Sequence, residues 1–483
     1  MSIQLYNTMS RKKEEFKPIV PGHVGIYVCG PTVYGPPHLG HAKSYISFDV
    51  LVKHFRTRGY KVRYVQNITD VGHLTDDADA GEDKIQKQAK IDRVHPYEIV
   101  DRWMFQYFRD METLKINHPN FYVRATQHIG EQIEAIEKLI EKGYAYEVNG
   151  NVYYDIHKFS CYGKLSGRTL EDQKESGRIE TRSDKRDPRD FALWKKAEPN
   201  HVLFWNSPWG TGYPGWHIEC SVMSMKYLGE TIDIHGGGLE NSFPHHECEI
   251  AQAESLTGKP FVNYWVHHNM VTVDGVKMGK SLGNFKTCAE LLSRHSPEAL
   301  RAFILSTHYR SPANYTEEAI IAAATGLNRL SALYSGMSAI VGASSADSGT
   351  VLPEIQEMCL KADKAIGEAI DDDLDTPGAI ALIYNFVTDV NRISSAKSLS
   401  PASASEVLKI ITIWGNDVLG IIPMHKSTSE SHDIAPIMDL LLEIRKEMKI
   451  SKRFDISDKI RDRAKEAGII IEDTKEGVRW RKA

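Results

Sequence analysis

The chain has 483 residues, of which 41% are hydrophobic and 25% charged, a composition typical of soluble globular proteins. No run approaches 18 apolar residues, the N-terminus has no apolar secretory segment, and six scattered cysteines exclude a disulfide framework, so we expect a cytoplasmic protein without a membrane span. The net charge of −5 is unevenly spread, since residues 445–483 carry +5. A basic end on an acidic body is a weak indication of a polyanionic partner, and a solvated helical face is the simpler interpretation.

The N-terminal third predicts a parallel sheet. Residues 24–29 (VGIYVC) predict a strand, residues 42–55 a helix and residues 62–66 (VRYVQ) a second strand. A strand, a helix and a strand within about 45 residues form a βαβ unit. Residues 99–142 then predict a helical segment that ends at Gly143.

The rest of the chain changes character twice. Residues 150–199 are charged and rich in turns, with a short strand at 151–155, and indicate an insertion between two halves of the sheet. Strands resume at 231–234 and 262–267, and the pattern from residue 296 onward is almost entirely helical. The candidate linkers are residues 342–350, 394–405 and 426–433.

A first candidate ligand site directly follows the first strand. The segment Pro31 to His41 (PTVYGPPHLGH) opens a helix, whose N-terminus offers unpaired N–H groups and a positive dipole end to a phosphate. Gly40 would let a nucleotide approach the backbone closely, and His38 and His41 could donate hydrogen bonds to phosphate oxygens. Because two histidines at this spacing are common, a loop with incidental histidines is the competing interpretation.

A second candidate is the turn KMGKS at residues 277–281. Its two lysines could place mobile positive charge on a polyphosphate. Taken alone, a solvated basic turn is the simpler interpretation.

A third group carries the donor atoms of a metal site. Cys29 ends the first strand, Cys220 lies in GWHIEC, and His245 and Glu249 share one face of a predicted helix. Two thiolates, an imidazole and a carboxylate suit tetrahedral zinc. Two distant cysteines form no local zinc motif, however, and singly each residue is more simply a buried thiol or a capping group. Spacing alone leaves three other ligands open, namely His246, Glu247 and Cys248.

HLGH and KMGKS together resemble the HIGH and KMSKS motifs of class I aminoacyl-tRNA synthetases, with Leu39 and Gly279 as mild departures. The segments YVCGPTVY, HLGH, NITD, GWHIECS, DIHGGG, FPHHE and KMGKS follow the order of the cysteinyl-tRNA synthetase family over residues 27–281. Three features depart from that family. They are LENS at 239–242, a longer segment after NITD, and Cys248 where the family usually has asparagine.

The resemblance implies a fold and a domain order. The fold is α/β, with a doubly wound, Rossmann-like parallel-sheet catalytic domain interrupted by a connective insertion, then an α-helical bundle and a small anticodon-binding domain. The expected segments are residues 1–115 and 200–268 for the catalytic domain, 116–199 for the insertion, 269–320 for the stem-contact region with the KMGKS loop, 321–425 for the tRNA-binding bundle and 434–483 for the basic anticodon-binding domain.

The resemblance also implies roles for individual residues. The zinc ligands, for one Zn²⁺ per chain, are Cys29, Cys220, His245 and Glu249. The catalytic residues are His38, His41, Lys277 and Lys280. The ATP site comprises Pro31, Thr32, His38, Gly40, His41, Lys277, Lys280 and Ser281. The cysteine pocket comprises Cys29, Gly30, Thr69, Trp216 and His235.

The implied activity is that of a monomeric ligase with ATP and Mg²⁺, L-cysteine and tRNA(Cys) as substrates and partners. Serine is nearly isosteric with cysteine, so an apolar pocket would separate them poorly. We therefore expect the substrate sulfur to coordinate zinc as a thiolate, without an editing domain. Two other functions remain open: a ligase that joins cysteine to a small amine with the same core, and a zinc-stabilised RNA-binding protein without catalysis. The basic C-terminus argues against the first, and His38, His41 and the two lysines argue against the second. A nucleotidyltransferase of similar fold is disfavoured by the zinc set and the chain length.

Overall fold

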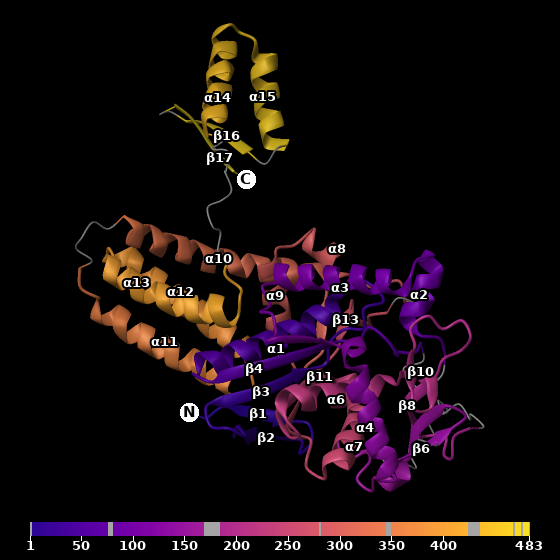
Figure 1. Cartoon of the computed structure of the whole chain (residues 1–483). Helices are drawn as coiled ribbons and strands as arrows, with labels where there is room; N and C mark the ends of the chain where they lie inside the picture. Colours follow the sequence, from indigo (N-terminus) through magenta and orange to yellow (C-terminus); the bar gives the residue numbers. More distant parts are fainter. Residues whose placement is uncertain are drawn as a thin grey trace. The chain divides into compact units, whose positions relative to one another are not determined.

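The computed structural model describes residues 2–75, 81–168, 184–279, 282–343, 349–423, 435–466, 469–474 and 477–482. Contacts divide the chain into two units, Met1–Ile422 and Pro423–Ala483 (Figure 1). The finer domain boundaries expected above stay predictions. No helix in the described ranges has both the length and the apolar character needed to cross a bilayer.

A five-stranded parallel sheet is the centre of the first unit. Its order is β12-β11-β3-β4-β5, and every neighbouring pair in it is parallel. The strands are β3 (His23–Val28), β4 (Lys61–Ile68), β5 (Phe121–Arg124), β11 (Ile232–Gly238) and β12 (Val262–His268). The chain runs outward from β3 to β5 and then returns to β11 on the other side of β3, which confirms the predicted doubly wound sheet.

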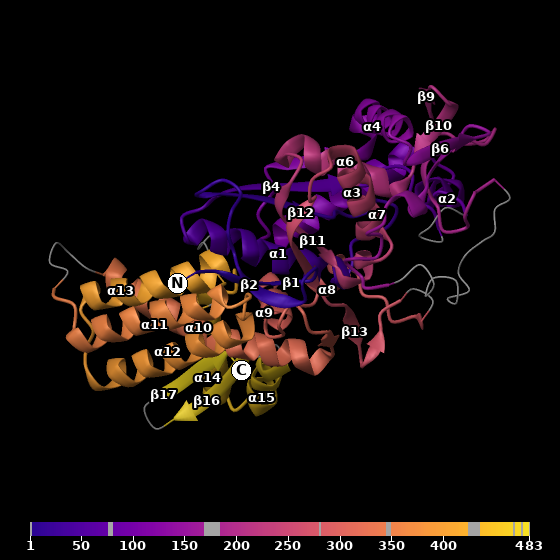
Figure 2. The ribbon, with the colours of Figure 1, turned by 90° about the horizontal axis from the view of Figure 1, so that it is seen from below.

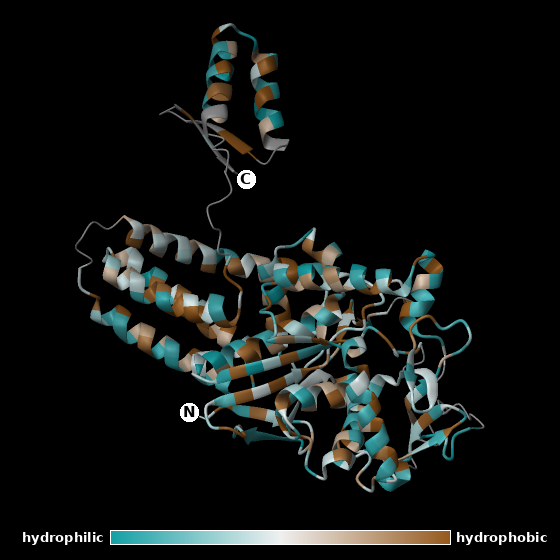
Figure 3. Cartoon of the chain, viewed as in Figure 1, coloured by the Kyte–Doolittle hydropathy of each residue, from teal (hydrophilic) through white to brown (hydrophobic). Residues whose placement is uncertain are grey.

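Successive side chains along the strands point to opposite faces of this sheet, and both faces are buried. Ile26 and Val28 of β3 pack in the same cluster as helix α1 (Leu39–Thr57), whereas Tyr27 packs in a second cluster. That second cluster includes residues of α6 (Trp216–Leu228) and α7 (His245–Thr257). Side chains on both faces are expected where helices cover a parallel sheet from both sides. In Figure 3 the strands of this sheet carry brown segments, whereas the charged strand β2 (Lys12–Glu15) is teal.

The long helix expected over residues 99–142 is wrong. The structure has α3 (Pro96–Thr113), then β5, and then α4 (Ile129–Glu141). The segment between them, HPN at 118–120, contains a proline that lacks the N–H needed to continue a helix. The following β-branched and aromatic FYVR pairs with β4 as the edge strand of the sheet.

A second sheet begins within the predicted insertion at 116–199 and extends beyond its expected end, since two of its strands lie at 205–214. Its five strands are antiparallel in the order β6-β7-β8-β10-β9. They are β6 (Ala145–Val148), β7 (Asn151–Tyr154), β8 (Phe191–Lys196), β9 (Trp205–Ser207) and β10 (Gly210–Pro214). The strand expected at 151–155 is therefore present, and the chain from it returns through α6 to β11.

A small sheet carries the KMGKS segment. Strand β13 (Val271–Val273) pairs in parallel with β15 (Ala313–Tyr315) and antiparallel with β14 (Val276–Lys277). It follows β12 directly, so the parallel sheet and the hairpin β13-β14 are joined by residues 269 and 270.

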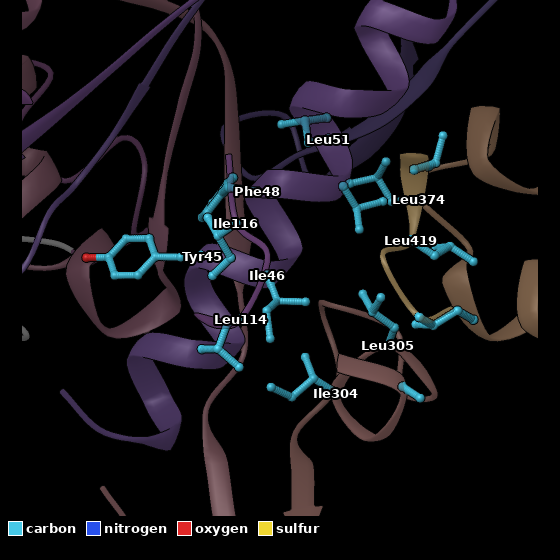
Figure 4. Packing of buried hydrophobic residues seen from close by; sticks show 14 of the residues in the cluster. Tyr45, Ile46, Phe48, Leu51, Leu114, Ile116, Ile304, Leu305, Leu374 and Leu419 are labelled. Atoms are coloured by element: carbon cyan, nitrogen blue, oxygen red, sulfur yellow. The ribbon is translucent and has the colours of Figure 1, made fainter. Parts of the chain in front are cut away.

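Helices between residues 297 and 418 form a further part of the first unit (Figure 2). They are α9 (Pro297–Leu305), α10 (Glu317–Gly342), α11 (Pro353–Asp371), α12 (Thr376–Ala396), α13 (Pro401–Ile410) and η5 (Ile411–Val418). One hydrophobic cluster continues from α1 into this bundle, as Ile46 and Leu51 lie around the same interior as Leu305, Leu374 and Leu419 in Figure 4. Helix α1 is thus packed against both the sheet and the bundle.

The second unit contains α14 (Ala435–Ile450), α15 (Phe454–Glu466) and the hairpin β16 (Ile469–Thr474) and β17 (Gly477–Lys482). The expectation of an almost entirely helical chain after residue 296 is wrong at β15 and at this hairpin. Three consecutive isoleucines at 469–471 favour a strand over a helix because β-branched side chains lose rotamer freedom in a helix. The predicted linker at 426–433 lies outside the described residues.

Candidate active site

A cavity of about 540 Å³ opens at the carboxyl ends of the central strands. It is lined by Cys29 and Gly30, which follow β3, and by Gly238 and Glu240, which end and follow β11. The chain reverses its direction of strand addition between β3 and β11, and ligands bind at such switch points in open α/β sheets. The fold therefore places this cavity at the end of β3. The candidate metal ligand Cys29 lies there, and the candidate phosphate-binding segment begins there at Pro31.

The two histidines of HLGH cap the helix at the edge of this cavity. His38 is the N-cap of α1 and its Nδ1 accepts a hydrogen bond from the Gly40 N–H at 3.1 Å, while His41 Nδ1 accepts from the His38 N–H at 3.2 Å. The rings stack at 3.8 Å. Because each Nδ1 accepts, a neutral ring carries its proton on Nε2, where it can donate to an anion.

The KMGKS segment meets HLGH across the cavity. Lys277 and Met278 line it together with His38 and His41. The chain after the turn is held against the HLGH loop, because the Leu39 N–H donates to the Lys286 carbonyl at 3.0 Å and the Cys288 N–H to the Pro37 carbonyl at 2.9 Å. Two motifs about 240 residues apart in sequence are thereby brought to one site. Lys280 and Ser281 lie outside the described residues.

The expected metal ligands also come together. Cys29, Cys220, His245 and Glu249 each place a donor atom within 4.8 Å of the others, and all four are buried. Cys29 follows β3, Cys220 lies on α6, and His245 and Glu249 lie one turn apart on α7, with His245 Nε2 3.1 Å from Glu249 Oε1. The same geometry holds for a second set, which shares Cys29 and Glu249 and adds His235 and His246.

The electrostatics of this cluster suit a cation. Burial, together with Glu249 and Glu219, raises the pKa of Cys29 to about 11, and burial raises the pKa of Cys220 well above its ordinary value. Burial also lowers the pKa of His245 well below its ordinary value, so its imidazole is neutral. Two buried thiols beside buried carboxylates are costly as anions without a positive charge, and a divalent ion both binds neutral imidazole and deprotonates a coordinating thiol.

A layer of further histidines surrounds the cluster. His235 Nε2 lies 2.8 Å from Glu249 Oε2, and His217 Nδ1 lies 2.8 Å from His245 Nδ1. His246 lies 3.3 Å from the Cys29 sulfur and its other nitrogen lies 2.8 Å from His267. Partners of this kind orient ligand side chains around a metal.

The expected cysteine pocket is only partly a cavity wall. Trp216 lines the cavity and is stacked between His73, at 3.9 Å, and His245, at 4.1 Å. Thr69 lies beneath the surface, where its hydroxyl donates to Glu219 and accepts from Asn67. His235 is fully buried beside Glu249 and does not line the cavity.

The remaining expected residues lie at the cavity. Pro31, Thr32, Gly30 and Gly40 all line it. Gly30 has a steric reason to lack a side chain, since a Cβ there would lie 1.5 Å from the Asn67 carbonyl oxygen.

Sequence reasoning missed several polar residues of the cavity wall, among them His73 and Lys84. His73 bonds Thr32 through Nδ1 and lies 2.8 Å from the Lys84 nitrogen through Nε2. His73 lies in the segment after NITD that attracted notice only for its length, and Lys84 directly follows that segment at the start of α2 (Lys84–Asp92). The available signal was that this segment directly succeeds the carboxyl end of β4.

Comparisons with known proteins agree with this geometry. The family model described as "tRNA synthetases class I (C) catalytic domain" matches residues 15–325, and the DALR domain model matches residues 365–423. Among curated proteins, the chain is 52% identical to the Cysteine--tRNA ligase of Chlorobaculum tepidum and 48% identical to that of Thermus thermophilus. Each alignment covers 100% of this chain and 99% of the relative.

Solved structures with the same fold are more distant in sequence. LeuRS of Agrobacterium radiobacter in a ternary complex with tRNA and LeuAMS superposes with a TM-score of 0.62 at 13% identity, covering 84% of this chain and 85% of that chain. Methionyl-tRNA synthetase of Mycobacterium tuberculosis with methionyl-adenylate gives a TM-score of 0.57 at 16% identity, covering 82% of this chain and 89% of that chain. At these identities the likeness shows the fold alone.

Proposed function

The chain belongs to the cysteine--tRNA ligase family, and from this premise we propose that it activates L-cysteine with ATP and transfers the cysteinyl group to the 3′ end of tRNA(Cys). One observation supports the proposal most directly: a single cavity contains both expected sites. Cys29, which belongs to the metal-type cluster of Cys29, Cys220, His245 and Glu249, lines one part of the cavity. His38, His41 and Lys277 line another part. An amino acid bound at the first part and a triphosphate at the second would have their reacting groups in a single enclosed space.

We propose zinc as the ion, held by Cys29, Cys220, His245 and Glu249. This set offers two sulfur ligands, which zinc favours, whereas the alternative set with His235 and His246 offers one. When bound, zinc supplies a preference for a thiolate over the hydroxyl of serine. Cys29 is 9% exposed and lines the cavity, whereas the other three ligands are at most 2% exposed, so a substrate sulfur would approach from the Cys29 side.

The chain's own side chains supply the rest of the amino-acid site. Trp216 provides an apolar wall whose position is fixed by stacking on His245. Thr69 acts indirectly. Its hydroxyl donates to the buried Glu219, which directly precedes the proposed ligand Cys220 on α6. His235 holds Glu249 and acts as a positioning residue for that ligand.

Activation requires the cysteine carboxylate to attack the α-phosphate of ATP, with pyrophosphate leaving. His38 and His41 would donate Nε2–H groups to the phosphates at the N-terminus of α1, and Lys277 with Lys280 would neutralise the charge that develops on pyrophosphate. Mg²⁺ accompanies ATP in reactions of this type. Catalysis of this kind depends on positioning and charge stabilisation.

Three further properties belong to the proposal. They are the monomeric state, a cytoplasmic location and binding of tRNA(Cys) by the helical bundle and the basic second unit. The charge of +5 over residues 445–483 supports the last of these.

The deciding experiment is cysteine-dependent ATP–pyrophosphate exchange on metal-replete and zinc-stripped protein, with serine as competitor. We expect exchange with cysteine alone, lost on stripping and restored by zinc. Exchange that survives stripping and still prefers cysteine would refute selection by zinc. Folded protein without exchange would refute the activity, and transfer to a small amine but not to tRNA(Cys) would favour the related ligase function.

A further inference from the structure

Lys43 is a buried cation on the helix that presents the two histidines. It lies two residues after His41 on α1 and is 1% exposed. Its ammonium nitrogen donates to the carbonyl oxygen of Ser311 and, at 3.3 Å, to that of Met270. Within the described part of the chain, no carboxylate forms an ion pair with it.

Both acceptors lie at the base of the sheet that carries Lys277. Met270 joins β12 to β13, and its carbonyl also accepts from the Ala313 N–H of β15 at 3.1 Å. Ser311 lies two residues before β15. The register then continues from Thr272 of β13 to Lys277 of β14, so the position of Lys277 follows from that of β13. Lys43 holds the backbone just before β13, at Met270, and just before β15, at Ser311.

We propose that Lys43 is a positioning residue for cysteine activation: its charged form holds the hairpin of Lys277 at the correct distance from His38 and His41, and loss of its proton loosens that hold. This inference rests on the proposed function. A charged donor makes hydrogen bonds about twice as strong as a neutral one, so a neutral amine would retain the contacts but weaken them.

The surroundings of Lys43 bring the loss of its proton into a pH range in which the enzyme can be assayed. Burial lowers the pKa of Lys43 to about 8, and Glu240 of η3 (Leu239–Ser242) partly opposes that shift. Among the described residues, His268 at the end of β12 also interacts electrostatically with this pair, and burial lowers its own pKa. The remaining partners of Lys43, on the segments at 270 and 311, are neutral carbonyls.

The test is the pH profile of cysteine-dependent ATP–pyrophosphate exchange from about pH 6.5 to 9.5 in four proteins. In the natural protein we expect an alkaline loss with a midpoint near pH 8. Lys43→Arg, which stays charged, should move that midpoint upward by at least one pH unit. Lys43→Met should lower exchange about tenfold at neutral pH, as expected for losing a charge-assisted hydrogen bond, and leave the KM for cysteine unchanged. Lys53→Arg, a matched change at another buried lysine of α1, should leave the midpoint in place.

The substrates and the residues that line the cavity are the same in all four proteins, so the difference between profiles isolates Lys43. Equal alkaline midpoints in the natural protein and Lys43→Arg would overturn the inference, as would full exchange by Lys43→Met. If Lys43→Arg does not fold, Glu240→Gln decides, because removing that carboxylate should move the midpoint to lower pH, and an unmoved midpoint refutes the role. Absence of exchange in the natural protein would instead refute the proposed function.

Discussion

At the scale of single residues, the surroundings distinguish side chains that the sequence alone presents as equivalent candidate ligands. Cys220 and Cys248 are both buried, at 0% and 1% exposure. Cys220 faces the donor atoms of the metal-type cluster, whereas the Cys248 sulfur lies 3.3 Å from the Tyr162 hydroxyl. Spacing alone left both as ligands.

Cys220→Ser should therefore lose bound zinc and weaken cysteine binding by more than about 100-fold, since even residues behind a ligand cost 10- to 100-fold. The affinity for ATP should change little. Zinc content and the two dissociation constants measure this, with Cys248→Ser as the control that keeps its metal. Equal losses for cysteine and ATP would indicate misfolding, and metal loss in Cys248→Ser would reassign the ligand.

Lys277 is the described lysine of KMGKS that lines the cavity. Lys277→Met should lower the rate of exchange about 100-fold, the cost typical of one electrostatic donor in an active site, with little effect on the KM for cysteine. Lys286→Met is the control, because that lysine pairs with Glu290 outside the cavity lining. Comparable losses in both variants would show that Lys277 acts only through general charge.

At the scale of elements, α1 connects the helical bundle to the cavity, because it packs against the bundle and is capped by His38 at the cavity. Its C-terminal half is tied to α11, because Asp371 accepts from His54 at 2.8 Å and from Arg58 at 2.8 and 2.9 Å. Earlier on the helix, Asp49 pairs with the buried Arg301 of α9 at 2.7 Å. The helix that begins after His38 is thus fixed at its middle and at its C-terminal end.

Asp371→Ala should destabilise the protein by about 3 kcal/mol, because it leaves a buried histidine and a partly buried guanidinium without their partner. Asp372→Ala is a matched control, since that carboxylate is 59% exposed and pairs with Lys13 at the surface, where such pairs contribute about 1 kcal/mol or less. Urea unfolding of both variants measures the difference. Similar losses would contradict the importance of burial.

At the scale of the whole molecule, buried histidines make folding sensitive to acid. Complete or partial burial lowers the pKa of seven histidines, namely His54, His201, His245, His246, His267, His268 and His308. In the unfolded chain these groups take up protons near pH 6.5, whereas the folded His267 does so only at about 3.

The unfolded state therefore binds more protons below pH 6.5, and the free energy of unfolding should fall as pH drops from about 7.5 to 5. Urea unfolding of metal-free protein at several pH values measures this. His267→Gln should reduce the slope by up to one proton, about 1.4 kcal/mol per pH unit. A flat profile in the unsubstituted protein would contradict the prediction.

The division at residue 422 leads to a second prediction at this scale. Removing residues 423–483 should leave cysteine-dependent exchange within about twofold, because every described cavity residue lies in the first unit, whereas aminoacylation of tRNA(Cys) should fall at least tenfold as phosphate contacts are lost. Rates of both reactions for the shortened and full chains measure this. Loss of exchange with intact folding would show that the second unit contributes to the active site.

The sequence by itself determined the elements whose patterns are local. Strand β3, helix α1 and strand β4 follow from the local residue pattern, and the i, i+4 spacing of His245 and Glu249 predicts two candidate ligands on one helix face. Local rules failed at residues 99–142, where helical patterns on both sides concealed β5, an edge strand fixed by its pairing with β4. They also failed at β16 and β17, which lie in the stretch after residue 296 that was expected to be almost entirely helical.

Only the tertiary structure decided which distant side chains act together. The order of strands in the sheet sets Cys29 beside Cys220, and the return of the chain after KMGKS sets Lys277 across from His38. The same packing buried His235 and Thr69 behind the cavity, brought His73 and Lys84 into its wall, and enclosed Lys43 at the base of the hairpin. Local pattern records which face of an element is apolar, but the distance between two elements depends on how the whole core packs, and no short segment contains that information.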